Sequence, residues 1–179
     1  MHDLTDNELL IMTDSGNRSW LKEKLAERAA EMWYGFTYDQ GIGLTALIKR
    51  GVGPKNLDNI NPDITPERFK LKGTGVRTVK GRIVPYTGEE TREQAAKRIM
   101  AEGNILGNTG DLAGFLHDHP EEVEKWNWVD AISKDSRWTH PDGYVYVPYA
   151  RVGGARRRFD LHCLDDRPYS GDGVLVLSE

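Results

Sequence analysis

Residues 144–177 constrain the fold most, because their pattern predicts three antiparallel strands. Residues 144–152 are rich in β-branched and aromatic side chains, which favour strands. The glycine pair at positions 153 and 154 tolerates the positive φ angles of a tight hairpin. We therefore expect the chain to turn back there into a second strand, and residues 174–177 to form a third.

The second of these strands is predicted to have one apolar and one polar face. Alternate residues of a strand point to opposite faces, which sets Phe159, Leu161 and Cys163 against Arg158, Asp160 and His162. Pro148 has no backbone N–H to donate, so the first strand is expected at a sheet edge or a bulge.

Helical signals precede this sheet. Capping residues and apolar spacing predict helices over residues 5–12, from Ser19 to about Gly35, and from 44 to 50, with a further helix starting at Pro54 and burying Leu57. Residues 69–86 look extended and predict a hairpin with one basic face. Later helices are expected over residues 91–102, after Asp111, and from Pro120.

Residues 126–132 fit two patterns. Trp126, Trp128 and Ile132 alternate as in a strand, whereas Val123, Trp126, Val129 and Ile132 are spaced approximately as in a helix. The choice between strand and helix stays open for this segment.

These elements together predict an α+β fold. We expect a helical N-terminal half with a basic hairpin, followed by a C-terminal three-stranded antiparallel meander packed by helices. A single domain over residues 1–179 is expected, and the alternative divides the chain into 1–86 and 89–179 at the short segment between them.

Composition restricts the class of protein. The five Trp and seven Tyr residues argue against disorder, and no apolar run is as long as a membrane span. The lone Cys163 allows no internal disulfide and suits a reducing compartment. We expect a cytoplasmic protein without a membrane partner. No phosphate-loop, dinucleotide or paired-cysteine motif is present, so no cofactor is predicted.

Residues 44–60 place an apolar helix before the turn Gly51-Val52-Gly53-Pro54-Lys55 and a second apolar segment after it. This pattern resembles a helix-hairpin-helix motif. The resemblance implies that Gly51, Gly53 and Lys55 contact a nucleic-acid phosphate through backbone N–H groups and a helix N-terminus. Leu57 departs from the pattern, which has a small residue there. A plain αα-hairpin and a helix-turn-helix are the alternatives.

Basic residues are concentrated around and after this motif. Residues 49–82 contain nine basic and three acidic residues, a local net charge of +6, whereas the whole chain carries −4. Such asymmetry favours an anionic partner. The residues predicted to extend the nucleic-acid site are Lys70, Lys72, Arg77, Lys80 and Arg82. A solvated edge whose lysines prevent aggregation is the alternative.

The leading functional hypothesis is a non-enzymatic binding protein that contacts DNA or RNA backbone through residues 44–82. The alternative is a protein-binding, inhibitor or accessory protein, because Tyr and Arg are favoured at interfaces. Its predicted interface residues are Tyr144, Tyr146, Tyr149, Arg156 and Arg158. The third is a metal-dependent hydrolase, with His117 and His119 as the candidate ligands, although their spacing fits no recognised ligand pattern.

Overall fold

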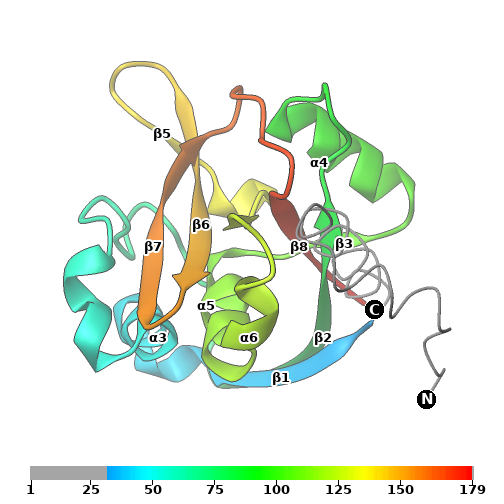
Figure 1. Ribbon diagram of the computed structural model, residues 1–179. Helices are drawn as coiled ribbons and strands as arrows, with labels where there is room; N and C mark the ends of the chain where they lie inside the picture. The colour runs from blue at the N-terminus through cyan, green and yellow to red at the C-terminus, as the bar shows by residue number, and fades with distance from the viewer. Residues whose placement is uncertain (1–31, 179) are drawn as a thin grey trace, which may run out of the picture.

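The computed structural model describes residues 32–178, which fold around one mixed β-sheet (Figure 1). The strands are β1 (Tyr34–Asp39), β2 (Val76–Pro85), β3 (Ile105–Leu106), β4 (Val129–Asp130), β5 (Trp138–Thr139), β6 (Val145–Gly153), β7 (Arg156–Cys163) and β8 (Gly173–Leu177). The α-helices are α3 (Leu44–Val52), α4 (Arg92–Ala101), α5 (Thr109–Asp118) and α6 (Pro120–Val123). The short 3-10 helices are η2 (Gln40–Ile42), η3 (Pro54–Asn59) and η4 (Lys134–Ser136).

The C-terminal strand lies inside the sheet. The strand order is β1-β2-β8-β4-β6-β5, with β3 pairing with β8 and β7 pairing with β6. β8 runs antiparallel to β2 and parallel to β4, whereas β6 and β7 form an antiparallel hairpin. The last strand of the chain, β8, therefore joins β1 and β2 of the N-terminal half to β4, β6 and β7 of the C-terminal half.

Each face of β8 packs into a different hydrophobic cluster. Leu175 and Leu177 belong to the larger cluster, to which α3 and α5 contribute their apolar sides. Val174 and Val176 belong to a second cluster that includes Ile99 of α4. Figure 1 accordingly shows α4 well apart from α3, α5 and α6. The sheet thus separates two apolar layers, and β8 is buried on both sides.

The predicted α+β class is confirmed, but the predicted arrangement is wrong. The N-terminal half is not purely helical, because β1 and β2 are paired sheet strands. The three C-terminal strands do not form a meander, because β8 leaves β7 and inserts between β2 and β4. The predicted basic hairpin over residues 69–86 is also wrong, since only β2 forms there and it pairs with β1 and β8. These pairings join residues far apart in the sequence.

Pro148 does not lie in an edge strand, because β6 has neighbours on both sides. Its carbonyl accepts a hydrogen bond from the backbone N–H of Ala131, which follows β4. In a strand the N–H and C=O of one residue point to the same side. Pro148 therefore lacks an N–H on the side of β6 that pairs with β4 and β5, at a position between these two short strands. The pairing of β6 with β7 on the other side loses no hydrogen bond.

Several local predictions hold and others fail. The helices at 44–52, 92–101 and 120–123 are present, and Thr91 and Gln94 form the expected capping box. The helix after residue 108 is capped by Asn108 rather than Asp111. The segment that starts at Pro54 is a 3-10 helix, and Leu57 is 42% exposed instead of buried. Residues 126–132 contain the two-residue strand β4, so the strand alternative holds for part of this segment and the helical alternative is wrong.

The predicted helix from Ser19 to Gly35 is wrong at its end, where β1 begins at Tyr34. The rest of that helix and the one over residues 5–12 fall outside the described residues. Within residues 32–178, no helix has the length and apolar character needed to cross a membrane.

Candidate functional site

The structure gives the residues of the helix-hairpin-helix resemblance separate environments. Gly51 lies in the last turn of α3, where a Cβ would come within 2.9 Å of the Ala113 carbonyl oxygen of α5. Its own carbonyl accepts a hydrogen bond from Arg157. Gly53 adopts a φ of 80° between α3 and η3, and Lys55 is exposed. Gly51 is thus explained by close helix packing, and Gly53 by the turn.

The basic residues that follow do not converge on one surface. Lys72 pairs with Asp135 at 2.6 Å, and Arg77 pairs with the buried Asp111 at 3.1 Å. Arg82 donates to Asn104 and lies over the Trp33 ring. Lys70 and Lys80 are exposed. Because alternate residues of β2 point to opposite faces, Arg77 lies on one side of the sheet and Lys80 and Arg82 on the other.

The two candidate metal ligands point to different partners. His117 contacts Asp118 through Nδ1 at 2.7 Å, whereas His119 lies 2.8 Å from the Gly35 carbonyl oxygen through Nε2. Within the described part of the chain, no group of three His, Cys, Asp or Glu side chains is arranged to hold a metal ion.

The residues of the predicted protein interface are divided between two faces. Tyr149, Arg156 and Arg158 share one face of the β6–β7 hairpin, while Tyr146 points to the other and packs against Trp138. Tyr149 is buried, and Tyr144 is exposed at the start of β6. These residues cannot all contact one flat partner.

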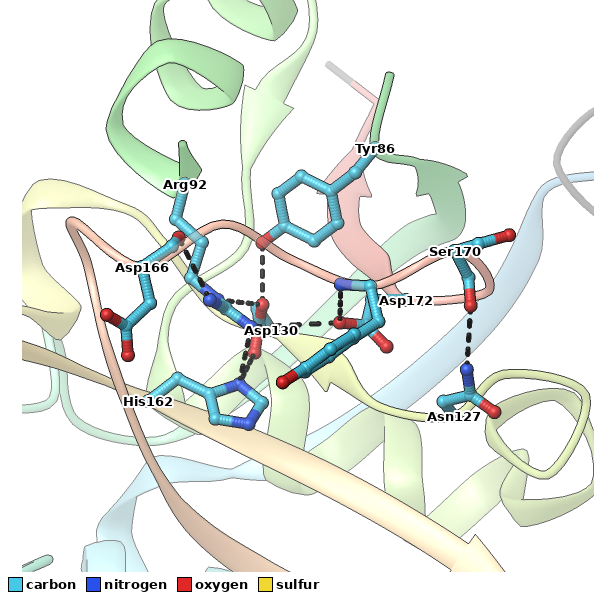
Figure 2. Close-up of polar contacts among 9 residues, drawn as sticks. Tyr86, Arg92, Asn127, Asp130, His162, Asp166, Ser170 and Asp172 are labelled. Carbon is cyan, nitrogen blue, oxygen red and sulfur yellow. Dashed lines mark hydrogen bonds and ion pairs between the residues drawn. The ribbon is translucent and has the colours of Figure 1, made fainter. Parts of the chain in front are cut away.

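A polar cluster that was not predicted lies beside that hairpin (Figure 2). We call it the His162 site and define it as Tyr86, Arg92, Asp130, His162 and Asp172. Asp130 comes from β4 and His162 from β7, while Tyr86 follows β2 and Asp172 precedes β8. Arg92 is the first residue of α4, and its side chain reaches from the helix to the sheet.

Asp130 is at the centre of the site. Its Oδ2 accepts hydrogen bonds from Arg92 Nε at 2.7 Å and from the Tyr86 hydroxyl at 2.6 Å. Its Oδ1 lies 2.9 Å from His162 Nδ1. Arg92 and Asp130 are both almost fully buried, with side-chain exposures of 3% and 0%. A buried ion pair of this kind is retained only when its hydrogen bonds are satisfied, and here both carboxylate oxygens are engaged.

The two aspartates of the site titrate differently. Burial opposes the ionisation of Asp130, but the hydrogen bond from His162 and the charge of Arg92 outweigh it, so the pKa of Asp130 is lowered. Burial raises the pKa of Asp172 to about 6, against the hydrogen bond from the Tyr169 N–H and with help from the Asp130 charge. Asp172 Oδ1 is buried and has no hydrogen-bond partner among the described residues.

His162 Nδ1 lies between a hydrogen-bond acceptor and a hydrogen-bond donor. Nδ1 lies 2.9 Å from both Asp130 Oδ1 and Arg92 Nη2. A proton on Nδ1 is donated to the carboxylate, whereas a lone pair there would face the negative oxygen. The Arg92 N–H can be donated only to a lone pair on Nδ1. The contact with Asp130 therefore favours the tautomer with its proton on Nδ1 and its lone pair on Nε2, whereas the contact with Arg92 favours the opposite tautomer. Figure 2 shows Nε2 pointing away from Asp130.

Two aromatic rings contact His162, and a third contacts one of them. We call Trp128, Tyr149 and Tyr169 the aromatic rim. Tyr149 stacks on the His162 ring with centroids 3.9 Å apart, and Trp128 meets the same ring edge-on at 5.3 Å. Tyr169 contacts Trp128 at 5.8 Å and is 70% exposed. The guanidinium of the exposed Arg151 lies 5.7 Å from the Trp128 ring centroid, within the range of a cation–π contact.

The loop that carries Tyr169 is held at both ends. Arg92 Nη1 donates to the Asp166 carbonyl oxygen at 3.1 Å, and Asn127 Nδ2 donates to the Ser170 carbonyl oxygen at 2.8 Å. Tyr169 itself donates its backbone N–H to Asp172 Oδ2 at 2.7 Å. The exposed ring of Tyr169 is thus presented from a fixed backbone next to Trp128.

Comparison with known proteins gives no relative for this chain: it matches no family model, no curated protein and no solved structure. The chemistry of the His162 site is therefore interpreted from its geometry. A histidine oriented by a buried carboxylate, with its second nitrogen unengaged, can accept or donate a proton. Aromatic and cationic side chains beside it are suited to planar, anionic ligands.

Sequence reasoning placed His162 on the polar face of its strand but did not identify its partners. Asp130, Arg92 and Tyr86 come from separate elements and belong to no local motif. One signal was available, since Arg92 directly follows the helix cap at Thr91 and its position at the start of α4 was thereby predictable.

Proposed function

We propose that the protein binds single-stranded nucleic acid at the aromatic rim beside His162. The observation that carries the proposal is the Trp128 ring, which contacts His162, Tyr169 and the guanidinium of Arg151. Bases of single strands stack on aromatic side chains in a sequence-tolerant way, and arginines beside those rings attract the phosphates. Arg158 adds a second exposed cation on the same face of the hairpin.

This proposal keeps the ligand class expected from the sequence and assigns it to a different surface. In the motif around α3 and η3, Gly51 is packed against α5. Of the basic residues that follow, Lys72, Arg77 and Arg82 contact other side chains of the protein. The aromatic rim instead combines rings and cations within contact distance of one another. Arg158 is partly neutralised by Asp160 at 3.3 Å, so Arg151 is expected to contribute more.

The test is fluorescence anisotropy with short labelled single-stranded RNA and DNA at low and moderate salt. Tyr169→Ala removes an exposed ring and is expected to weaken binding roughly tenfold, because stacking contributes about 1–3 kcal/mol per base. Arg151→Glu is expected to weaken binding further and to reduce its dependence on salt, because one phosphate contact is lost.

Lys55→Glu is the matched control for Arg151→Glu. It reverses a charge on an exposed residue in η3 and is expected to leave binding unchanged. If Lys55→Glu abolishes binding while Arg151→Glu and Tyr169→Ala do not, the turn between α3 and η3 is the binding site and the aromatic rim is not. Absence of binding at low salt would reject a nucleic-acid ligand and favour the protein-binding alternative.

A further inference from the structure

His162 has the arrangement of a general base. In the tautomer with its proton on Nδ1, that proton is directed at Asp130 Oδ1, and Arg92 and Tyr86 hold the carboxylate in place through the neighbouring oxygen. Its Nε2 has no hydrogen-bond partner among the described residues, and 19% of the side chain is exposed. A histidine held in one tautomer by a carboxylate, with the opposite nitrogen available, can take a proton from a bound molecule.

The described residues place no hydroxyl or thiol nucleophile in hydrogen-bond contact with this base. The hydrogen-bonding partners of the imidazole are Asp130 and Arg92. Cys163 follows His162 directly, so strand alternation points its thiol to the opposite face. A nucleophile activated by His162 must therefore come from the ligand or from water. RNA is a nucleic acid that carries its own nucleophile, the ribose 2′-hydroxyl beside each phosphate.

We infer that His162 Nε2 removes the proton of a 2′-hydroxyl of bound RNA and thereby cleaves the strand, an inference that rests on the proposed nucleic-acid binding. As the O2′–H bond breaks, O2′ bonds to the adjacent phosphorus and the bond from phosphorus to the 5′-oxygen breaks. The products are a 2′,3′-cyclic phosphate and a 5′-hydroxyl. The departing oxygen takes a proton from water, and the imidazolium returns its proton to the hydroxide that remains.

Two arginines have different parts in this reaction. Arg151 is exposed beside Trp128 and is the cation available to the phosphate, whose negative charge increases in the transition state. Arg92 is buried and acts as a positioning residue, because it holds Asp130 ionised and oriented behind His162. The aromatic rim holds the bases on either side of the reacting phosphate in place, which supplies the alignment that the attack requires.

The experiment follows cleavage of a short labelled RNA by the full chain and by His162→Ala. The wild type is expected to produce a 2′,3′-cyclic phosphate end, to leave the DNA of the same sequence intact, and to bind 2′-O-methyl RNA without cutting it. His162→Ala is expected to cleave at least about 100-fold more slowly, the usual contribution of a general base. Added imidazole is expected to restore part of the rate, which it could not do for a residue with a structural role alone.

His117→Ala is the matched control, because His117 also pairs with an aspartate but lies on α5 near the protein surface. It is expected to cleave at the wild-type rate. Wild-type protein that binds 2′-O-methyl RNA and leaves RNA intact overturns the inference while the proposed function stands. Equal cleavage by His162→Ala, or equal cleavage of DNA, also overturns it. If the wild-type protein binds none of the oligonucleotides, the proposed function itself is rejected.

Discussion

At the scale of single residues, the His162 site contains two carboxylates whose pKa values shift in opposite directions. Asp130 has three polar partners and is held ionised, whereas Asp172 faces the Asp130 charge and leaves one oxygen without a partner in the described structure. The distance between Asp172 Oδ2 and Arg92 Nη2 is 3.8 Å, longer than a hydrogen bond. The site therefore favours one negative charge more than two.

Asp172 should make the stability of the protein depend on pH. Its raised pKa, about 6, means that the native state binds a proton that the unfolded chain releases, so the free energy of unfolding falls as pH rises from about 4 to 6 and stays lower above that. Asp172→Asn removes this dependence. Between pH 5 and 8 the variant is expected to gain about 1 kcal/mol relative to the wild type in urea unfolding.

Asp165→Asn is the matched control for that measurement, because it removes an exposed carboxylate from the same loop. The explanation fails if Asp172→Asn and the wild type lose the same stability between pH 5 and pH 8.

Sequence patterns alone could not have identified the residues of the His162 site. His162 was correctly assigned to the polar face, because strand alternation is a local property. Asp130 gave no signal, since its three partners lie 32, 38 and 44 positions away in the chain. The contacts with His162 and Arg92 that lower the pKa of Asp130, and the burial that raises the pKa of Asp172, exist only after the sheet and α4 have come together.

At the scale of elements, glycines let α5 pack closely against α3 on one side and β1 on another. Gly51 of α3 faces the Ala113 carbonyl of α5, whereas Gly114 of α5 lies against the Tyr38 ring of β1, where a Cβ would come within 2.7 Å. The backbones can approach there because no side chain intervenes. This packing, rather than a ligand, accounts for glycine at position 51 inside a helix.

Gly51→Ala tests that explanation. In an exposed helix the change would stabilise by about 1 kcal/mol, because alanine has the higher helix propensity. Here the new Cβ would lie 2.9 Å from a backbone oxygen that cannot rotate away, so a net loss of about 1–3 kcal/mol is expected in urea unfolding. Thr45→Ala, on the exposed side of α3, is the control and should be neutral or stabilising. A stabilising Gly51→Ala would contradict the close contact.

Elements were predicted well where their signals are local. The capping box at Thr91 and the proline at the start of α6 identified two helices correctly. β1 was missed because the apolar spacing before it continues as in a helix, and pairing with β2 decides its structure. β4 has only two residues, too few for any periodic pattern.

At the scale of the whole molecule, β8 connects the two hydrophobic clusters. Its neighbours β2 and β4 come from opposite halves of the chain, and its alternate side chains enter the larger cluster on one face and the second cluster on the other. The meander predicted from the sequence would have left the two halves with few contacts. Insertion of β8 depends on pairing between residues about 90 positions apart, which no local pattern encodes.

This arrangement predicts that the two clusters unfold together. Leu175→Ala in the larger cluster and Ile99→Ala in the second each remove a fully buried side chain, and each is expected to cost about 2–5 kcal/mol. Because β8 contributes to both clusters, either variant should lower the midpoint of one cooperative urea transition, with tryptophan fluorescence and far-UV circular dichroism coinciding. One cooperative transition is the result expected if the chain forms the single domain predicted from the sequence. Two separate transitions, with Ile99→Ala shifting only one of them, would mean that the layer beneath α4 folds as an independent unit.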